Sequence, residues 1–532
     1  MRTIDLYSGI GGWSLGLKLA GLEIVGSFEW WSDAANTHTK NLGLPSNKLD
    51  IRELDLKTLP KNIDVVVGSP PCTQFSFANR GGSGDMEDGL KDIIKYFQVV
   101  SYLKPKYWAM ENVPRVTNIL IKEREIGGAL HQFNALLKDA FIETIDFSDF
   151  GTPQRRKRCI AGNFNSALLE EYKNVARKVV LGDVVGSMAQ EKIIDPLFNI
   201  QRKNSNVTGL ANEEAFSQEE LRINREAKEN HPVYNNMKFP DPLDKTSRTI
   251  TATCTRVSRE SVVIQDPLNK KFFRRLNVRE RASCQGFPIT YNFFGKSYPG
   301  QLKMIGNAIP PTFTYFLGNA FLSKPANEVV PLKKVNPKII STITEVTEHT
   351  PDSKGRMFRE NRSFQLAIEK LRFKSGTRFE LNNKKGGGNW SIEFFYGDSK
   401  NINTLILNRA LLSELVSRSR SLKSTNLQKI NITAKKSISK INHKELQKVW
   451  TNRAKGTHPF EFVDELDGIA KKCIAISKEI PDESVDELID FLFSESSSSA
   501  KPGRLVKLHK YGREIICGVL IGCNFNIKNV AP

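Results

Sequence analysis

A cysteine follows two prolines and precedes small polar residues in the segment GSPPCTQFS, residues 68–76. The apolar run at residues 65–67, in DVVVGSPPC, predicts a buried strand that ends shortly before Cys72. A nucleophilic thiolate must be exposed on one side and held rigidly, whereas a structural cysteine usually lies among apolar residues. The stiff, polar surroundings of Cys72 therefore predict a nucleophile.

Two other segments carry groups that suit chemistry beside a nucleophile. In KPKYWAMENVPRV, an apolar strand over residues 107–110 is followed directly by Glu111 and Asn112, and a carboxylate there is well placed for acid chemistry. In QRRKR, Gln154, Arg156 and Arg158 alternate and would share one face of an extended strand. Arginines in that arrangement suit a phosphate or a base edge.

The elements that must position these groups are typical of a doubly wound α/β sheet. IDLYSGIGGWSLGLKLAG predicts a strand over residues 3–7, a glycine turn and a helix, and a helix N-terminus offers free N–H groups to a nucleotide-like ligand. A second strand over residues 24–28 ends at Glu29, and a third turn contains Asp50. Because parallel strands bind ligands at their carboxyl ends, we expect Glu29, Asp50 and Cys72 on one edge.

The chain resembles a DNA (cytosine-5)-methyltransferase of the prokaryotic kind. The resemblance covers residues 1–323 and follows the order of the family's motifs: DLYSGIGG, FEW, LDI, GSPPCTQFS, ENV, QRRKR, RRLNVRERASCQGFP and MIGNAIPP. Tyr7 stands where the family frequently has phenylalanine. The implied fold is α/β, a doubly wound and mostly parallel sheet that binds S-adenosylmethionine, with a small inserted target-recognition domain. An additional α+β domain is expected at the C-terminal end, outside the resemblance.

The resemblance also implies a role for each matching residue. Cys72 would attack C6 of a flipped-out cytosine, Glu111 would stabilise charge at N3, Asn112 would hold the loop, and Arg156 and Arg158 would steady the base and the glutamate. S-adenosylmethionine would contact a set of residues from the turns and strand ends: Tyr7, Gly9, Ile10, Gly12, Glu29, Trp30, Asp50, Ile51, Pro71 and Asn307. The chemistry requires no metal.

The region between the motif blocks carries no family motif and is expected to recognise the target. We expect a catalytic and cofactor-binding domain over residues 1–164 and 273–323, interrupted by a target-recognition domain over residues 165–272. Residues 249–253 alternate and residues 261–265 predict a strand, so short β-strands there could reach groove edges and phosphates. The expected DNA contacts are Gln154, Thr249, Thr251, Arg256 and Arg259; a plain surface hairpin is the alternative.

Residues 324–350 predict a linker, and residues 351–532 a further basic domain outside the resemblance. Residues 351–460 hold 23 Lys+Arg against 8 Asp+Glu, whereas residues 461–490 hold 3 against 10 and predict a helix. Residues 358–374 predict an amphipathic helix, residues 378–383 and 389–397 two strands, and residues 505–522 a closing β-hairpin. An accessory DNA-binding module, a partner interface and a fused nuclease all stay open, although no ExK-like acidic cluster favours the nuclease.

Composition limits the protein's class and partners. The chain has 532 residues and a net charge of +20, which favours a polyanionic partner, here double-stranded DNA. Seven scattered cysteines without a CxxC pair suggest neither a disulfide framework nor a zinc site. No apolar run approaches 18 residues and no signal peptide is evident, so we expect a cytoplasmic protein without membrane contact.

The leading interpretation is an S-adenosylmethionine-dependent DNA cytosine-5 methyltransferase of a restriction–modification system, with a cognate restriction endonuclease as an expected partner in that system. A tRNA cytosine-5 methyltransferase, a bifunctional methyltransferase with a fused accessory domain, and a catalytically silent DNA-binding protein are the rivals. The sequence does not indicate which bases are recognised.

Overall fold

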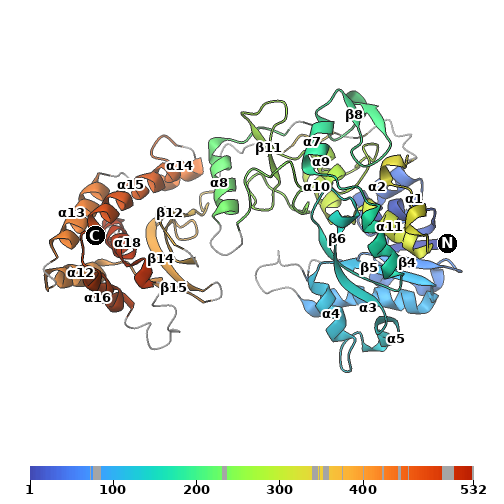
Figure 1. Ribbon diagram of the computed structural model, residues 1–532, viewed down its shortest axis with the longest axis horizontal. Helices are drawn as coiled ribbons and strands as arrows, with labels where there is room; N and C mark the ends of the chain where they lie inside the picture. Colours follow the sequence, from blue (N-terminus) through green and yellow to red (C-terminus); the bar gives the residue numbers. More distant parts are fainter. Residues whose placement is uncertain are drawn as a thin grey trace. The chain divides into compact units, whose positions relative to one another are not determined.

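The structure is a computed structural model that describes residues 1–71, 74–75, 85–211, 213–230, 236–337, 346, 348–351, 359–373, 376–398, 401–421, 424–440, 445–452, 454–493 and 508–529. The chain divides into two compact units, the first formed by Met1–His231 with Asn236–Ser353 and the second containing Lys354–Pro532 (Figure 1). Among the described residues, no helix combines the length and apolar character needed to cross a membrane.

A seven-stranded sheet forms the centre of the first unit, in the order β3-β2-β1-β4-β5-β7-β6. Strands β1 to β5 are parallel, whereas β7 runs antiparallel to both of its neighbours. The fold class is therefore α/β with a mostly parallel sheet, as predicted. The strands are β1 (Arg2–Leu6), β2 (Glu23–Phe28), β3 (Ser46–Asn47), β4 (Val65–Gly68), β5 (Tyr107–Asn112), β6 (Phe141–Asp146) and β7 (Lys157–Gly162).

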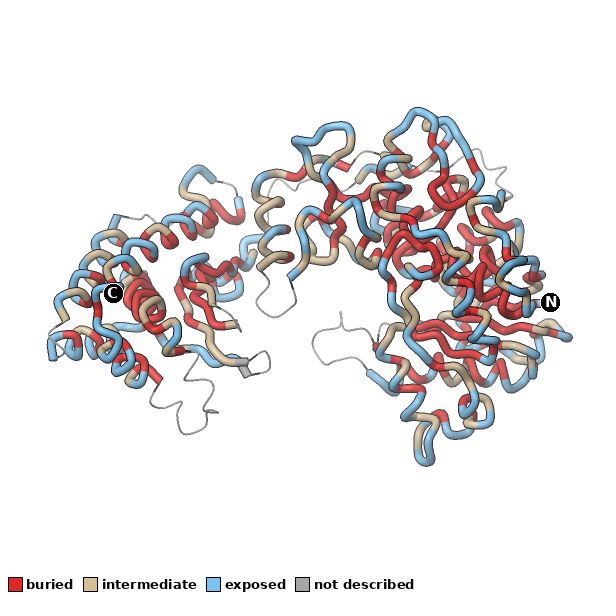
Figure 2. Tube along the Cα trace, in the orientation of Figure 1, coloured by how far each residue is buried: buried red, intermediate tan, exposed pale blue. Residues whose placement is uncertain are grey.

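Helices cover both faces of this sheet because its central strands are apolar on both sides. Val65 and Val67 share a buried cluster with Trp13 and Phe313, while Val66 packs in a second cluster with Tyr96. Figure 2 shows the resulting buried strands between layers of helix. The first layer contains α1 (Gly12–Ala20) and α11 (Pro311–Phe321); the second contains α3 (Met86–Leu103), α4 (Arg115–Glu123) and α5 (Asn134–Leu137).

The remaining elements of the first unit pack partly in the first apolar cluster and partly around a third one, which α2 (Ser32–Leu42) also contacts. They include two short antiparallel pairs, β8–β9 and β10–β11. Residues 249–253 form no strand, in contrast to the prediction, and the predicted strand at 261–265 is present only as β10. The elements are α6 (Ser166–Glu171), α7 (Leu181–Met188), β8 (Lys192–Ile194), β9 (Gln201–Lys203), α8 (Gln218–Glu229), β10 (Val263–Gln265), β11 (Phe273–Arg275), α9 (Val278–Cys284) and α10 (Tyr298–Asn307).

The first part of the expected linker is packed against the first unit. Val329 and Leu332 are buried in the same apolar cluster as α11. Apolar residues lie between the prolines of this segment. When they pack against the first unit, their apolar surface is removed from water, which stabilises the packed arrangement.

The second unit combines a four-stranded antiparallel sheet with helices. The sheet has the order β12-β13-β14-β15, and α18 packs on β14, where Asn526 Oδ1 accepts from the Ile392 N–H at 2.8 Å. Trp390, Ile392 and Phe394 are buried, so this face of β14 is a core face. The elements are β12 (Gln365–Arg372), β13 (Arg378–Asn382), β14 (Ser391–Asp398), β15 (Asn401–Leu405), α12 (Arg409–Ser421), α13 (Thr425–Ser439), α14 (Leu446–Asn452), α15 (Pro459–Ser477), α16 (Asp482–Phe493) and α18 (Gly512–Asn529).

Two elements of the second unit differ from the prediction. The segment expected as an amphipathic helix is strand β12, whose register against β13 shifts between Ala367 and Arg372. This bulge interrupts the two-residue period and gives the buried side chains a spacing that imitates a helix. The segment expected as a closing hairpin contains helix α18, because a run that is apolar all round cannot be assigned by periodicity alone.

Five of the six described cysteines are fully buried free thiols: Cys159 and Cys284 in the first unit, and Cys473, Cys517 and Cys523 in the second. Burial raises the pKa of Cys159 and of Cys284 to about 12. It also raises the pKa of Cys473 and of Cys523 to about 12, and that of Cys517 still further.

Candidate active site

Four parallel strands end at one edge of the sheet, and the predicted polar groups follow them directly. Tyr7 follows β1, Glu29 follows β2, Ser69 follows β4, and Glu111 with Asn112 closes β5. The parallel registers of these strands bring their ends together. The structure therefore gathers at one edge the groups that the sequence placed at strand ends.

The first glycine turn combines an open backbone with a tight one. Gly9 has φ 52°, and a Cβ there would meet nothing within 4 Å, so the outer side of the turn is open. A Cβ at Gly12 would instead lie 2.0 Å from the Ile309 carbonyl oxygen, which brings α1 close to α11. Ile10 is buried, and its carbonyl accepts a hydrogen bond from the Tyr291 hydroxyl.

Glu29 is buried and bound to this turn. Its Oε2 accepts from the Gly9 N–H at 2.9 Å, and its Oε1 accepts from the Trp31 N–H at 2.7 Å. Desolvation raises the pKa of Glu29, and these backbone N–H groups oppose the rise. Trp30 beside it is 67% exposed, so a large aromatic surface borders the buried carboxylate.

The Tyr7 hydroxyl, which a phenylalanine would lack, has a definite partner. It donates to the Asp92 carbonyl at 3.1 Å, and Asp92 also pairs with Arg52 at 2.7 Å. Burial, followed by the charge of Asp92, raises the pKa of Tyr7 strongly. Asp50 is exposed and accepts from the Arg52 N–H at 3.0 Å, while Ile51 is buried. No sequence pattern indicated a role for Asp92, which lies inside α3.

The loop after β4 is held from both sides before it reaches the nucleophile motif. Ser69 Oγ accepts from Trp13 Nε1 at 2.9 Å, and the Pro70 carbonyl accepts from Asn112 Nδ2 at 3.1 Å. Asn112 Oδ1 in turn accepts from the Val113 N–H at 2.9 Å. Pro71 is exposed, and Cys72 lies outside the described residues. Asn112 thus ties the end of β5 to the segment that leads to Cys72.

Glu111 is paired with a cation from the antiparallel strand β7. Arg158 Nε lies 3.1 Å from Glu111 Oε1, and only 6% of Glu111 is exposed. Ile160 is the register partner of Glu111, so Arg158 stands two residues away on the same face and can reach diagonally. The carboxylate is therefore held in one orientation by a partly buried arginine.

Arg156 ties two loops together. Its guanidinium donates to the Ile250 carbonyl and to the Gly306 carbonyl, both at 3.1 Å. Gly306 is the next-to-last residue of α10, before the exposed Asn307, and a Cβ at Gly306 would lie 2.4 Å from the Thr251 backbone. Arg156 therefore positions the segment around Asn307 rather than projecting outward.

Two predicted DNA contacts are corrected by the structure. Gln154 is buried, donates to the Cys284 carbonyl at 3.0 Å and accepts from the Ile250 N–H at 2.8 Å. Arg256 is 6% exposed and pairs with Glu220 at 2.6 Å. A DNA contact by either side chain would break an internal bond in a buried site, so both are structural.

The other predicted contacts are partly exposed and locally bonded. Thr249 Oγ1 donates to the Arg155 carbonyl and Thr251 Oγ1 to the Thr253 carbonyl, both at 2.8 Å. Arg259 lies 3.3 Å from Glu260 Oε1. Within the described ranges, no group of three or more His, Cys, Asp or Glu is placed to hold a metal ion.

A buried polar network that the sequence did not reveal lies beneath the glycine turn. Asp5 Oδ2 accepts from Ser14 Oγ at 2.7 Å, and His38 Nε2 is 3.0 Å from the same hydroxyl. Desolvation raises the pKa of Asp5 from 3.8 to about 7 and lowers the pKa of His38 from 6.5 to about 4.

These two shifts act in opposite directions on stability. The contribution of Asp5 to the free energy of unfolding is fully present below pH 3.8 and is lost as the pH rises to about 7. The reason is that the folded state keeps the Asp5 proton up to a higher pH than the unfolded state does. The contribution of His38 is fully present above pH 6.5 and is lost as the pH falls to about 4. Between about pH 4 and pH 6.5 the two slopes therefore oppose each other.

The sheet is mostly parallel, has a glycine turn after its first strand, and carries acids and a positioned loop at its carboxyl edge. These features define an α/β fold whose carboxyl edge suits a nucleotide-like ligand. The family model of the C-5 cytosine-specific DNA methylases matches residues 1–323, and the chain belongs to this family. It is a DNA (cytosine-5-)-methyltransferase, and several of the proteins it resembles carry the name type II methyltransferase.

Individual relatives match the same part of the chain. The type II methyltransferase M.MthTI of Methanothermobacter thermautotrophicus is 29% identical over 330 residues, which cover 58% of this chain and 93% of that protein. The type II methyltransferase M.AplI of Arthrospira platensis is 31% identical over 315 residues, 58% of this chain and 82% of that protein. The solved structure of the S. pombe Dnmt2 methyltransferase is 18% identical with a TM-score of 0.42, covering 61% of this chain and 98% of that one.

Proposed function

We propose that the protein transfers a methyl group from S-adenosylmethionine to C5 of a cytosine in a specific double-stranded DNA sequence, through a covalent adduct of Cys72 with a flipped-out base. The observation that carries the proposal is the pairing of buried Glu111 with Arg158, beside a loop that Asn112 fastens on the way to Cys72.

The residues of the carboxyl edge fit the proposed cofactor. The turn at Gly9 has an open side, Glu29 offers a second lone pair on each oxygen beside its backbone bonds, and Trp30 offers an exposed aromatic face. A nucleoside with ribose hydroxyls and a planar base suits such a set. S-adenosylmethionine would supply an electrophilic methyl group when bound there, with Asp50, Pro71 and Asn307 as further contacts.

The proposed reaction can be followed bond by bond on the cytosine ring. The Cys72 thiolate forms a bond to C6, and the C5–C6 π electrons become available at C5. Glu111 donates a hydrogen bond or proton at N3, which stabilises the charge that develops on the ring. C5 would then take the methyl group as the S–CH3 bond of the sulfonium breaks, with S-adenosylhomocysteine as the leaving group. Loss of the C5 proton to a general base and elimination of the Cys72 thiolate from C6 would restore the C5–C6 double bond.

The attack on C6 comes from above the ring plane, which stacked neighbours block inside a duplex. The target base must therefore be flipped out, at a cost of a few kcal/mol. We assign the recognition of the target to residues 165–272, inserted between catalytic segments 1–164 and 273–323. The names of the type II methyltransferases that this chain resembles support a restriction–modification role.

Transfer of labelled methyl from S-adenosylmethionine tests this proposal. Mixed-sequence duplex DNA and bulk tRNA serve as acceptors, and Cys72→Ser serves as the matched variant. We expect label at C5 of cytosine in DNA and its loss in the variant with duplex binding retained. Label on tRNA alone would assign the protein to an RNA substrate, and unchanged turnover by Cys72→Ser would refute the covalent role of this cysteine.

A further inference from the structure

The second unit separates its charges between neighbouring helices. Residues 409–440, which include α12 and α13, hold eight Lys+Arg and one Asp+Glu, whereas residues 461–490, in α15 and α16, hold 3 against 10. Surface helices that only need solubility usually mix both signs, because neighbouring opposite charges stabilise a helix. The separation leaves one part of the unit with an uncompensated positive surface.

Helix α13 contributes most of this surface. It contains no acidic residue, and Lys429, Lys435 and Lys436, with Lys440 just beyond its end, are exposed. None of these lysines forms an ion pair with another described residue. At 100° per residue, Lys429, Lys436 and Lys440 follow one stripe that extends for about 16 Å along the axis.

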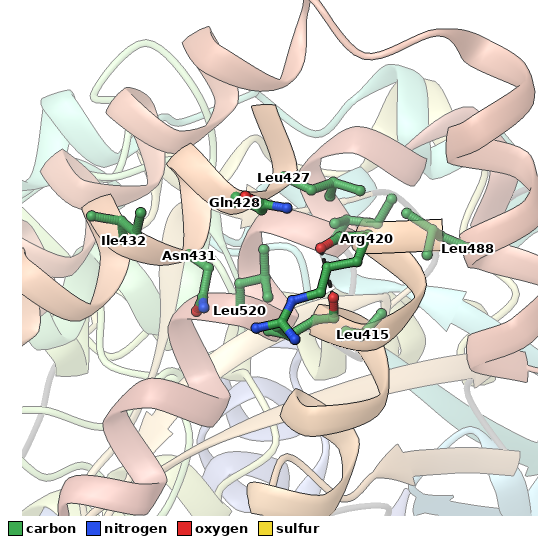
Figure 3. A pocket seen from close by; sticks show the side chains of 11 residues that line it. Leu415, Arg420, Leu427, Gln428, Asn431, Ile432, Leu488 and Leu520 are labelled. Carbon is green, nitrogen blue, oxygen red and sulfur yellow. Dashed lines mark hydrogen bonds between the residues drawn. The ribbon is translucent and has the colours of Figure 1, made fainter. Parts of the chain in front are cut away.

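Helix α12 adds a cation near Lys435, which lies about 100° around α13 from Lys436, at the other edge of the exposed side of the helix. Its exposed Arg420 lines a cavity of about 200 Å³ together with Gln428 and Asn431 of α13 (Figure 3). Gln428 lies about 20° from Lys435 around the helix, so Arg420 borders the side of α13 on which Lys435 stands. We call Arg420, Lys429, Lys435, Lys436 and Lys440 the cation face.

A merely solvated surface is the simpler explanation, and two observations argue against it. Lys436 and Lys440 are like charges at i,i+4, a spacing that costs a helix about 0.2–0.5 kcal/mol when no acid intervenes. The acids that could have relieved this repulsion lie instead on α15 and α16. Among the described residues these long cations have no acidic partner, and the groups between them include the Gln428 amide and the exposed Ile432. Such a set of cations fits a row of phosphates.

We propose that the cation face binds the phosphate backbone of duplex DNA and supplies a sequence-independent contact outside the methyltransferase unit. The proposal rests on the DNA substrate of the proposed function and adds a second place at which that substrate is held. Contacts with phosphates release counterions, so each neutralised phosphate contributes about 0.9 to the slope of log affinity against log salt.

The experiment uses the full chain and a mixed-sequence duplex. The variant K429Q/K435Q/K436Q removes three cations of the cation face, and K471Q/K472Q/K478Q removes three exposed lysines from the acidic side as a control with the same net charge. Affinity is measured over a series of salt concentrations. We expect the first variant to lower the slope by about 2.7 and the control to leave it near the wild-type value.

Two further measurements separate this proposal from the methyl transfer. Circular dichroism and thermal unfolding confirm that both variants are folded, and turnover at saturating DNA should be the same in both. Equal slopes in the two variants, or a slope unchanged by the first, would overturn the cation face as a DNA site. A lowered slope in a protein that transfers no methyl group would support the cation face while refuting the proposed function.

Discussion

Replacement of Asn112 is a sharp test of how the loop before Cys72 is positioned. The side chain is 1% exposed and forms two different bonds: it donates to the Pro70 carbonyl and accepts from the Val113 N–H. Asn112→Ala removes both bonds, whereas Asn112→Asp retains the acceptor and places a carboxylate oxygen against the Pro70 carbonyl.

The expected size of the effect follows from these two contacts. A net hydrogen bond is worth about 1 kcal/mol, and a buried carbonyl left without a donor costs about 1–3 kcal/mol. We therefore expect Asn112→Ala to destabilise the hydrogen-bonded conformation of the loop by about 2 kcal/mol. If the transition state needs that conformation, kcat should fall roughly thirty-fold. Asn112→Asp should be worse near neutral pH, because it buries an anion opposite a carbonyl.

The assay is methyl transfer at saturating DNA and cofactor, measured over a range of pH. Asn112→Asp should recover as the pH falls, because a protonated carboxyl can again donate to the Pro70 carbonyl. Asn163→Ala is the matched control, since Asn163 accepts from the Trp108 N–H at 2.7 Å and donates to the Lys106 carbonyl at 3.0 Å at the other end of β5. Wild-type kcat in Asn112→Ala, or an equal loss in Asn163→Ala, would refute the reasoning.

Two further predictions concern buried charges. Arg158→Gln leaves Glu111 buried without its cation, so it should destabilise the protein by about 3 kcal/mol and lower kcat at least ten-fold. The control is Arg155→Gln, which removes an ion pair whose arginine is largely exposed. This control should change stability by less than about 1 kcal/mol. Urea unfolding and methyl transfer measure both variants, and equal losses would contradict the role of Arg158. In the wild type, the titrations of Asp5 and His38 change the free energy of unfolding in opposite directions between pH 6.5 and pH 5. Asp5→Asn removes the first titration, so only the destabilising protonation of His38 remains. As the pH falls over this range, the variant should therefore lose about 2 kcal/mol of stability relative to the wild type. Parallel pH profiles of unfolding in the two proteins would exclude this coupling.

The strands of the catalytic sheet could be predicted from the sequence because they are buried on both faces. Val65 to Val67 form a continuous apolar run that ends at Gly68 and the following prolines, whereas the apolar residues of β2 and β5 give way directly to Glu29 and Glu111. Polar residues directly after such runs are forced to the carboxyl edge, so Glu29 and Glu111 were placed correctly by position alone.

The parts that failed depend on partners that are distant in the sequence. Arg256 was expected to reach DNA, but its partner Glu220 lies 36 residues earlier, and no local pattern announces that pair. Strand β12 was mistaken for a helix because one bulge changes the period of its buried side chains. Asp92 bonds to both Tyr7 and Arg52, but it lies in the middle of a helix. From the sequence alone, an aspartate at that position would be taken for an ordinary surface residue.

The buried cysteines of each unit can report local unfolding of that unit. A thiol reagent reacts with the thiolate, so a thiol that is both enclosed and held protonated stays silent until its surroundings come apart. Cys159 and Cys284 would report opening of the methyltransferase unit, and Cys473, Cys517 and Cys523 that of the basic unit. The labelling kinetics of the native protein can therefore separate the local stabilities of the two units, with no engineered probe in either.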